Sequence, residues 1–424
     1  MTEEKFFSWI LHTMYMTRRN KRYGRDSIDF EADFAPRLIR MMRELQQKTF
    51  RVDHNYAFLV SSPRWREIFA TCFEGRIADH LLCDTLAPYL DEVLHPRTFN
   101  NRIGKGAQAA INQVIEDICE VTHGYTRHAR VIKWDLKGFF PSANLDIMEQ
   151  MFHRLIDDYH DDISARFGDA EMPAFLRWLA TVAIHCRPQE HCELRTPRRL
   201  WDEHIDPDKS LFPRPPGVGA PIGRLTSQMG MGLYMNDEVR WLNDECGVRA
   251  TLFMDDCVMV VPENAHRMTL AMFGLLRKRL SAKGIRLNEK KFYDQPYQHG
   301  LEFLGRHIKP YRIHLNNKTY GRCIDRVKEF NKAPDKQRSI DRFISSVNSY
   351  TGLLKGCTDY GRTMKVAQTI DSVWLEYISW DDRRQRILHK PDSAVRRRLN
   401  QKYNLRLTIK RKRNDTSRNP SAAK

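Results

Sequence analysis

The sequence has no apolar run long enough to cross a lipid bilayer, because no stretch approaches the roughly 18 apolar residues that a spanning helix needs. It also lacks the charge order of a secretory signal. Within residues 1–25, acidic residues precede a short apolar run and basic residues follow it, which is the reverse of a signal peptide. We therefore expect a soluble protein in the cytoplasm, with no membrane partner.

Paired cysteines and an acidic excess are also missing. Nine cysteines are scattered over 424 residues, an odd number without the spacing of a small disulfide framework, so we expect reduced thiols. Acidic residues number 53 against 70 lysines and arginines, which leaves a net charge of +17. Such an excess suits a polyanion, because each basic group near a phosphate releases condensed counterions. A nucleic acid is the expected partner, and a protein that is merely basic is the alternative.

The chain is long enough for two or three subdomains, and 41% of its residues are hydrophobic. No internal repeat interrupts it. Apolar periodicity and turn residues predict its elements in order. They are helices within 1–60, a strand over 130–142 ending in a turn, helices over 144–186, an irregular Pro-rich connector near 186–218, a helix over 226–244, a strand–turn–strand over 249–263, a helix over 264–283, short strands within 287–310 and helices over 323–400.

The connector contains four side chains that could bind zinc. The segment HCRPQEHC offers His185, Cys186, His191 and Cys192. Their spacing is not that of a standard zinc finger, and the histidines and cysteines alternate. We favour a polar connector without metal, with the zinc site as the alternative.

Three aspartates carry the strongest chemical signal. Asp255 and Asp256 lie side by side at the tip of the apolar strand–turn–strand, where like charges repel and stabilise nothing. Taken alone, such a pair is equally well explained by a solvated turn. Asp135 ends another apolar strand, and the three carboxylates converge if the two strands are neighbours in one sheet. Because Mg²⁺ prefers carboxylate oxygens, this pattern predicts a two-metal site for in-line attack on a phosphate.

The order and spacing of several motifs resemble the reverse transcriptase family. WDLKGFFPS, GAPIGRLTSQ, FMDD, LNEKK and FLG are similar to motifs A to E of its palm, and PRWREI, FEGRIADHLL and NRIGKGAQAA to its fingers motifs. Within the family, IGRLTSQ and SVNSYTGLLK resemble two bacterial branches. These are the diversity-generating retroelement enzymes and the "unknown group" enzymes, which include phage-defence reverse transcriptases.

This resemblance implies an α+β fold, namely a right-hand polymerase with fingers, an antiparallel palm sheet and a helical thumb. The implied parts are N-terminal helices and fingers over 1–125, the palm over 126–310 with an insertion near 186–218, the helical thumb over 311–404 and a basic tail over 405–424. The implied reaction is RNA-directed synthesis of a DNA product from dNTPs, with two Mg²⁺ ions, or Mn²⁺ in their place, as cofactors.

The resemblance also implies roles for individual residues. Asp135, Asp255 and Asp256 would hold the metal ions. Lys291 would donate a proton to the departing pyrophosphate, with Lys290 as a near-equal alternative. Arg64 and Arg66 are implied to clamp the triphosphate, and Phe140 to act as a steric gate against the ribose 2′-hydroxyl. Gly223 and Ser227 are implied to leave room for the nucleotide and the template. Gly305 matches the glycine of the family's primer-grip turn.

Two of these assignments leave alternatives open. Either Phe139 or Phe140 is expected to be a core residue, and the resemblance favours Phe140 as the gate. Arg76 is a further candidate for the triphosphate, or else a structural partner of Asp79 or Glu74.

The motifs also depart from the family's usual wording. Ile222–Gly223 and Ser227–Gln228 stand where Gln-Gly and Ser-Pro are usual, which puts fidelity and templating in doubt. Phe253 stands where tyrosine is commoner, and the loss of that hydroxyl should not remove metal binding.

Basic residues gather toward the C-terminus, where nine fall between positions 396 and 413 without one acid. We expect an RNA template or dedicated noncoding RNA as a partner, with a solvated tail as the alternative reading of this cluster. An accessory protein or a homo-oligomer is also open, and the biological role is either phage defence or retroelement diversification. The rival functions are an RNA-dependent RNA polymerase, against which Phe140 and FLG argue, and a catalytically silent RNA-binding scaffold, against which the three aspartates argue.

Overall fold

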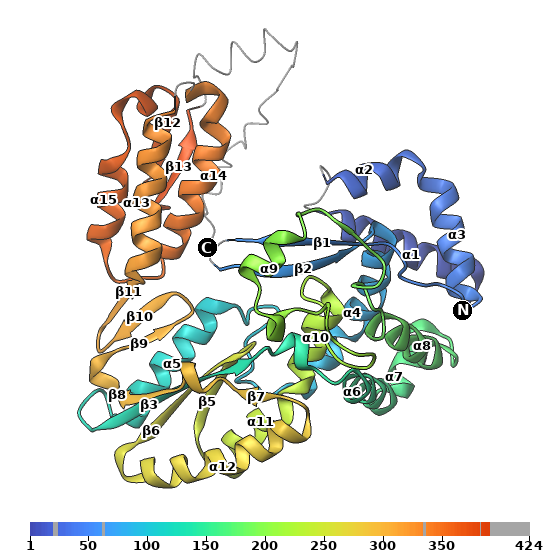
Figure 1. Cartoon of the computed structure of the whole chain (residues 1–424), viewed down its shortest axis with the longest axis horizontal. Helices are drawn as coiled ribbons and strands as arrows, with labels where there is room; N and C mark the ends of the chain where they lie inside the picture. The colour runs from blue at the N-terminus through green and yellow to red at the C-terminus, as the bar shows by residue number, and fades with distance from the viewer. Residues whose placement is uncertain (20–23, 62–63, 334–335, 382, 391–424) are drawn as a thin grey trace, which may run out of the picture. The chain divides into compact units, whose positions relative to one another are not determined.

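The computed structural model describes residues 1–19, 24–61, 64–333, 336–381 and 383–390. The basic cluster at 396–413 and the predicted tail over 405–424 lie outside the described residues. The chain divides into two compact units, Met1–His299 and Gly300–Lys424, and each is described by itself (Figure 1). The predicted boundaries between fingers, palm and thumb are finer than this division and stay predictions.

The first unit begins with three helices whose apolar faces are buried. Helix α1 starts after Thr2, whose hydroxyl accepts a hydrogen bond from the Lys5 amide, and it packs against the long α4. The prediction of helices within residues 1–60 is confirmed as far as Gln46, and a strand follows. The helices up to the palm are α1 (Glu3–Arg18), α2 (Arg25–Ala32), α3 (Phe34–Gln46), α4 (Phe73–Val93) and α5 (Ala107–Val121).

A three-stranded sheet joins the N-terminal part to the connector. Strands β1 (Asn55–Val60) and β2 (Arg66–Thr71) form an antiparallel hairpin, and β4 (Cys192–Leu194) pairs with β1 in parallel. The connector was predicted to be irregular, and this was wrong for β4 and for helix α9 (Arg199–His204). A strand this short has no periodicity of its own, and it exists because β1, far away in sequence, supplies its hydrogen bonds.

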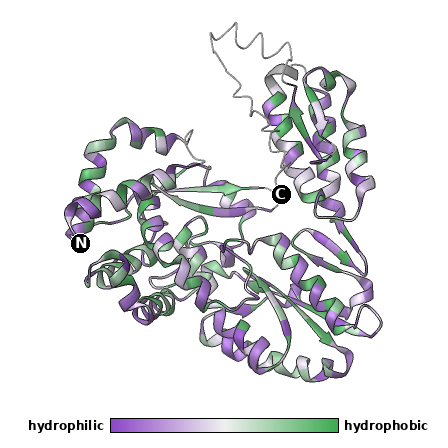
Figure 2. Ribbon diagram, turned by 180° about the vertical axis from the view of Figure 1, so that it is seen from behind, coloured by the Kyte–Doolittle hydropathy of each residue, from purple (hydrophilic) through white to green (hydrophobic). Residues whose placement is uncertain are grey.

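The first unit contains a second sheet, the central sheet, whose strands show green, hydrophobic stretches beside purple, hydrophilic ones in Figure 2. The strand order is β5-β6-β3-β7, with β8 also paired to β3, and every pairing is antiparallel. Helix α5 packs against β5 and β6, and α12 packs against β6 and β7. These elements are β3 (Ala129–Lys137), β5 (Arg249–Phe253), β6 (Asp256–Pro262), α12 (His266–Ala282), β7 (Arg286–Leu287) and β8 (Tyr293–Pro296).

Among the remaining helices of the first unit, α6, α8 and α10 contact α4. Helix α10 contacts α4, α6 and α8, and its buried residues include two glycines that let it approach them closely. These helices are α6 (Leu145–Asp158), α7 (His160–Phe167), α8 (Met172–Ile184), α10 (Leu225–Tyr234) and α11 (Asn236–Arg240).

The second unit combines two small sheets, one of three strands and one of two, with helices. Its core includes Trp374, which stacks on Phe343 with 4.1 Å between ring centroids. Helices were predicted throughout 323–400, and this was wrong for the hairpin of β12 and β13. The elements are β9 (Leu301–Phe303), β10 (Arg306–Lys309), β11 (Arg312–Leu315), α13 (Asn317–Asn331), α14 (Lys336–Leu354), α15 (Tyr360–Thr369), β12 (Ile378–Asp381) and β13 (Arg386–His389).

The predicted fold class is confirmed, because helices and antiparallel sheets combine in a mixed α+β architecture consistent with a right-hand polymerase. Among the helices that the structure describes, none is both long and apolar enough to traverse a bilayer.

Candidate active site

The three predicted aspartates meet at neighbouring strand ends in the central sheet. Asp135 lies opposite Asp256 in the antiparallel register of β3 and β6. Asp255 lies in the turn between β5 and β6, and its carbonyl accepts a hydrogen bond from the Leu136 amide (3.2 Å). The turn is closed by Met254, whose φ of 57° is the left-handed conformation used in tight hairpins. The strands that carry the carboxylates are therefore neighbours, as the sequence argument required.

Negative charge accumulates at this point. Asp135 is only 3% exposed, and Asp255 is half-buried. Burial, together with the charges of Asp135 and Asp256, raises the pKa of Asp255 from 3.8 to about 6. Such a shift marks a carboxyl group with too little positive charge around it.

Two lysines and an asparagine hold the carboxylates in place. The Nζ of Lys133 lies 3.3 Å from Oδ1 of Asp256, and Lys291 forms an ion pair with Asp135. Asn288 is bound to Asp135 twice, because its amide donates to the Asp135 carbonyl (2.8 Å) and its Nδ2 lies 3.2 Å from Oδ1. Lys290, the alternative to Lys291, is exposed. Sequence reasoning missed Asn288, although it lies in the LNEKK motif, and missed Lys133, which is two residues before Asp135.

The donor set fits hard divalent cations. Three carboxylates offer oxygen ligands, and a cation would relieve the repulsion that raises the pKa of Asp255. The chemistry of the donor set therefore fits such a cation, and the number of ions stays a prediction.

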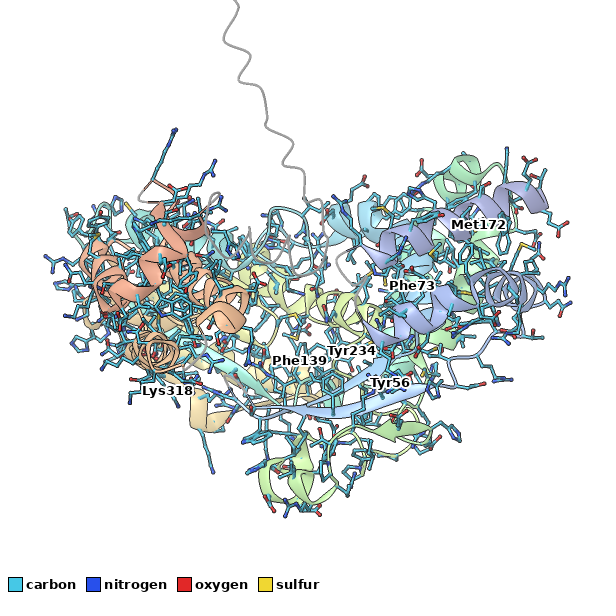
Figure 3. The ribbon with its side chains drawn as sticks, turned by 90° about the horizontal axis from the view of Figure 1, so that it is seen from above. Tyr56, Phe73, Phe139, Met172, Tyr234 and Lys318 are labelled. Atoms are coloured by element: carbon cyan, nitrogen blue, oxygen red, sulfur yellow. The ribbon has the colours of Figure 1, made fainter. Side chains whose placement is uncertain are left out.

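The structure separates the two phenylalanines of the predicted gate. Phe139 is 4% exposed and belongs to the main core (Figure 3). Phe140 is only partly buried, and its ring meets that of Phe139 edge to face, with 5.8 Å between centroids. The Phe140 carbonyl accepts from the Ala220 amide (2.9 Å), which fixes the backbone of this residue. Phe139 is thus the core residue of the two, and the gate role of Phe140 stays a prediction.

The predicted clamp arginines lie at the turn end of the β1–β2 hairpin. Arg66 begins β2 opposite Val60, and both Arg64 and Arg66 are exposed. Between them and the core, Glu67 is buried and accepts hydrogen bonds from Trp201 Nε1 (2.7 Å) and the Leu211 amide (2.7 Å). The connector is therefore anchored to the strand that carries Arg66, a link that sequence reasoning missed.

Arg76 has a partner other than the ones suggested. Its guanidinium donates to Asp26 Oδ2 (2.6 Å) and to the Thr71 carbonyl (3.1 Å). The suggested pairing with Asp79 or Glu74 was wrong, because those carboxylates pair with other arginines on neighbouring elements.

Gly223 and Ser227 lie at the start of α10, next to the hairpin. Gly223 has φ of 122°, and a Cβ there would meet the Phe69 carbonyl oxygen at 2.7 Å. The amide of Phe69 in turn donates to the Ile222 carbonyl (2.8 Å). Ser227 is 5% exposed within the helix. Glycine is therefore required at 223 by the backbone itself, whereas the roles beside nucleotide and template stay predictions. Gly305 lies in the second unit with φ of 79°.

The four zinc donors suggested in the connector do not gather into a site. Among the described residues, the one group with metal-site spacing is Asp146, Glu149 and His185. Cys186 Sγ instead faces the Val52 carbonyl (3.5 Å). His185 thus reaches a carboxylate cluster on α6 rather than the cysteines.

Comparison with known proteins finds no matching family model and no matching curated protein. Among solved structures, the telomerase of Candida albicans in complex with a TWJ fragment of telomeric RNA is similar over 78% of this chain and 59% of that chain, with 11% identity and a TM-score of 0.43. Apo telomerase from Candida tropicalis is similar over 76% of this chain and 60% of that one, with 9% identity and a TM-score of 0.46. The chain spans less than two-thirds of the length of these structures.

Proposed function

We propose that this chain is an RNA-directed DNA polymerase that extends a primer with dNTPs. The observation that carries the proposal is the pairing of Asp135 with Asp256 across β3 and β6, with Asp255 in the adjoining turn. Three carboxylates at adjoining strand ends destabilise a fold unless cations offset their charge. Enzymes of phosphoryl transfer use such an arrangement to hold metal ions. The motif order that resembles reverse transcriptases supports the same reaction.

The proposed chemistry divides among the chain's own residues. Asp135 and Asp256 are fixed by the strand ladder, so their oxygens are positioned before substrate arrives. Mg²⁺, or Mn²⁺, held by the three aspartates would supply charge neutralisation at the reacting phosphate and activation of the primer hydroxyl. Lys291 lies beside Asp135, where it can release the carboxylate and donate a proton to the departing pyrophosphate.

Two groups would select and hold the nucleotide. The exposed guanidinium groups of Arg64 and Arg66 suit bidentate contacts with triphosphate oxygens. Phe140, whose ring is not fully buried, would exclude a ribose 2′-hydroxyl by steric clash. Ser227 and Gly223 would leave space for the template and nucleotide.

The partner would be a template or dedicated noncoding RNA, in keeping with a net charge of +17. The resemblance to two bacterial branches supports a role in phage defence or in retroelement diversification, with an accessory protein or a second copy as further partners. The cytoplasm is the proposed location.

Primer extension tests the reaction directly. The purified chain is given a primed RNA template with Mg²⁺ and either dNTPs or rNTPs. We expect extension with dNTPs that requires both the RNA template and the divalent metal. Preferential extension with rNTPs would favour an RNA-dependent RNA polymerase. RNA binding without extension under Mg²⁺ or Mn²⁺ would favour the silent scaffold.

A further inference from the structure

A second set of metal-ligating side chains lies outside the aspartate site. Asp146 and Glu149 lie in α6, and His185 caps the C-terminal end of α8, so the set is assembled from two packed helices (Figure 1). One ligand atom from each residue lies within 4.8 Å of the other two. The Nε2 of His185 is 3.0 Å from Glu149 Oε2 and 3.9 Å from Asp146 Oδ1.

These separations match the spacing of ligands around one small cation. Zinc binds histidine nitrogen and carboxylate oxygen at about 2.0–2.2 Å, so two tetrahedral ligands lie roughly 3.4 Å apart. The separations from His185 to the two carboxylates fall on either side of that value. Small rotations of the exposed Asp146 side chain, which is 69% exposed, would bring the three atoms to a common centre.

The surroundings hold Glu149 in the orientation that a ligand needs. Its second oxygen, Oε1, accepts a hydrogen bond from Thr181 and lies 3.6 Å from His153 Nε2. One oxygen of the Glu149 carboxylate is thus held by its neighbours, and the other lies toward His185. Such outer partners orient the ligands of metal sites.

We propose that Asp146, Glu149 and His185 bind one Zn²⁺ ion, with water completing its coordination. A histidine nitrogen beside carboxylates favours zinc over Mg²⁺, which prefers an all-oxygen shell. The competing interpretation is a histidine–carboxylate hydrogen bond that takes up no metal.

The position of the set indicates what the ion would do. The connector leaves α8 directly after His185, and it returns at Gly217, whose carbonyl accepts a hydrogen bond from the amide of Leu145 (2.8 Å). Asp146 is the next residue. An ion held by His185 and Asp146 would thus tie both ends of the connector to α6, and the connector carries Trp201 and Leu211, which bind Glu67 beside the hairpin arginines. The site is structural in this proposal and does not depend on the proposed polymerase activity.

Zinc titration of the full chain tests the proposal. Calorimetry is run in excess Mg²⁺, so that the aspartates of the palm sheet are already occupied, and Co²⁺ absorption provides a second signal that reports nitrogen ligation. We expect one zinc equivalent that Glu149→Gln and Asp146→Asn each weaken by roughly 10- to 100-fold. His160→Gln is the matched control, because His160 is an exposed histidine one helix away; it should bind zinc as the parent does.

Limited proteolysis of the connector gives a readout that is independent of affinity. Zinc should slow cleavage within the connector in the parent and in His160→Gln, but not in Asp146→Asn. Asp146 is exposed, so this variant keeps the fold, and its unfolding temperature without metal should match the parent's. Undiminished zinc binding in both Asp146→Asn and Glu149→Gln, or a parent chain that takes up no zinc at micromolar concentration, would overturn the proposal.

Discussion

Two groups of carboxylates in the first unit differ in how far the chain neutralises their charge. Asp79 is 2% exposed and faces the guanidinium of Arg224, itself 1% exposed, which also donates to the Ala183 carbonyl (2.8 Å). Thr226 adds a further hydrogen bond to Asp79 (2.7 Å). Where β3 ends beside the turn between β5 and β6, three carboxylates face two lysines, and the pKa of Asp255 rises to about 6.

This difference in charge neutralisation distinguishes residues that stabilise the fold from residues that we propose to bind a ligand. The charge of Asp79 is satisfied completely within the chain, so its loss should damage stability. The charge around Asp255 is not satisfied by the chain, so its loss should damage the reaction and leave the fold intact. Arg224 lies inside the GAPIGRLTSQ motif, together with Gly223 and Ser227, for which we propose contacts with substrate. One motif can therefore contain a residue that stabilises the fold beside residues proposed for binding.

The largest effect is expected from replacing both turn aspartates. Asp255→Asn with Asp256→Asn should reduce primer extension by roughly 10³-fold or more, because the proposed divalent metal would lose the charge that holds it. The unfolding temperature should stay the same or rise, since repulsion is relieved. Extension rates and thermal unfolding are measured on the same preparation, and extension at the parent's rate would remove the active-site assignment.

The complementary variant is Asp79→Asn. It leaves the guanidinium of Arg224 buried without a countercharge, so we expect a loss of about 3–5 kcal/mol in the free energy of unfolding. Urea denaturation measures this loss. Asp29→Asn is the control, because the Asp29–Arg25 pair is exposed and should contribute little. Equal effects of the two substitutions would contradict the buried-pair interpretation.

A narrower comparison concerns the two adjacent lysines. Lys291→Ala should slow nucleotide addition by roughly 10²-fold, because it removes the side chain that we propose as the proton donor beside Asp135. Lys290→Ala should change it little, since both lysines are exposed but the ion pair with Asp135 is made by Lys291. Single-turnover extension separates chemistry from product release. Should Lys290→Ala be the slower enzyme, the assignment within LNEKK has to be exchanged.

The smallest expected effect separates the two phenylalanines. Phe140→Val should raise ribonucleotide incorporation relative to deoxyribonucleotide by roughly 10- to 100-fold, because a steric clash is removed. Phe139→Val should instead lower the unfolding temperature without changing sugar selection, since Phe139 fills the core. Competition between dNTP and rNTP in extension assays measures selection. Unchanged exclusion of rNTPs in Phe140→Val would place the gate elsewhere.

Predictions from the sequence succeeded where neighbouring residues alone determine the structure. The apolar run before Asp135 and the runs on either side of Asp255 predict strands, and the carboxylates converge on the condition that these strands are neighbours, which the structure shows. Sequence reasoning failed where the partner is distant. The residues of β4 do not indicate that the strand pairs with β1. Likewise, the sequence around Arg224 does not indicate that its partner is Asp79 in α4, which packs against α10.

The same limit explains the errors in side-chain roles. Arg76 was considered for the triphosphate or for the nearby Asp79 and Glu74, because sequence shows only close neighbours. Its partner Asp26 comes from an N-terminal helix. His185 likewise was grouped with the adjacent cysteines, whereas packing of α8 on α6 brings it to Glu149. In both cases a helix–helix contact, which depends on tertiary packing, decides the partner.

The close approach at Gly223 also has a mechanical meaning. The Phe69 amide is bonded to the Ile222 carbonyl, and the Phe69 carbonyl oxygen occupies the space where any side chain at 223 would lie. The β1–β2 hairpin and the segment before α10 are therefore joined by a direct backbone contact. We expect a movement of the hairpin that carries Arg64 and Arg66 to be coupled to a movement of α10, which contains Ser227. In the proposed function, closure over the triphosphate would then occur together with a rearrangement beside the template.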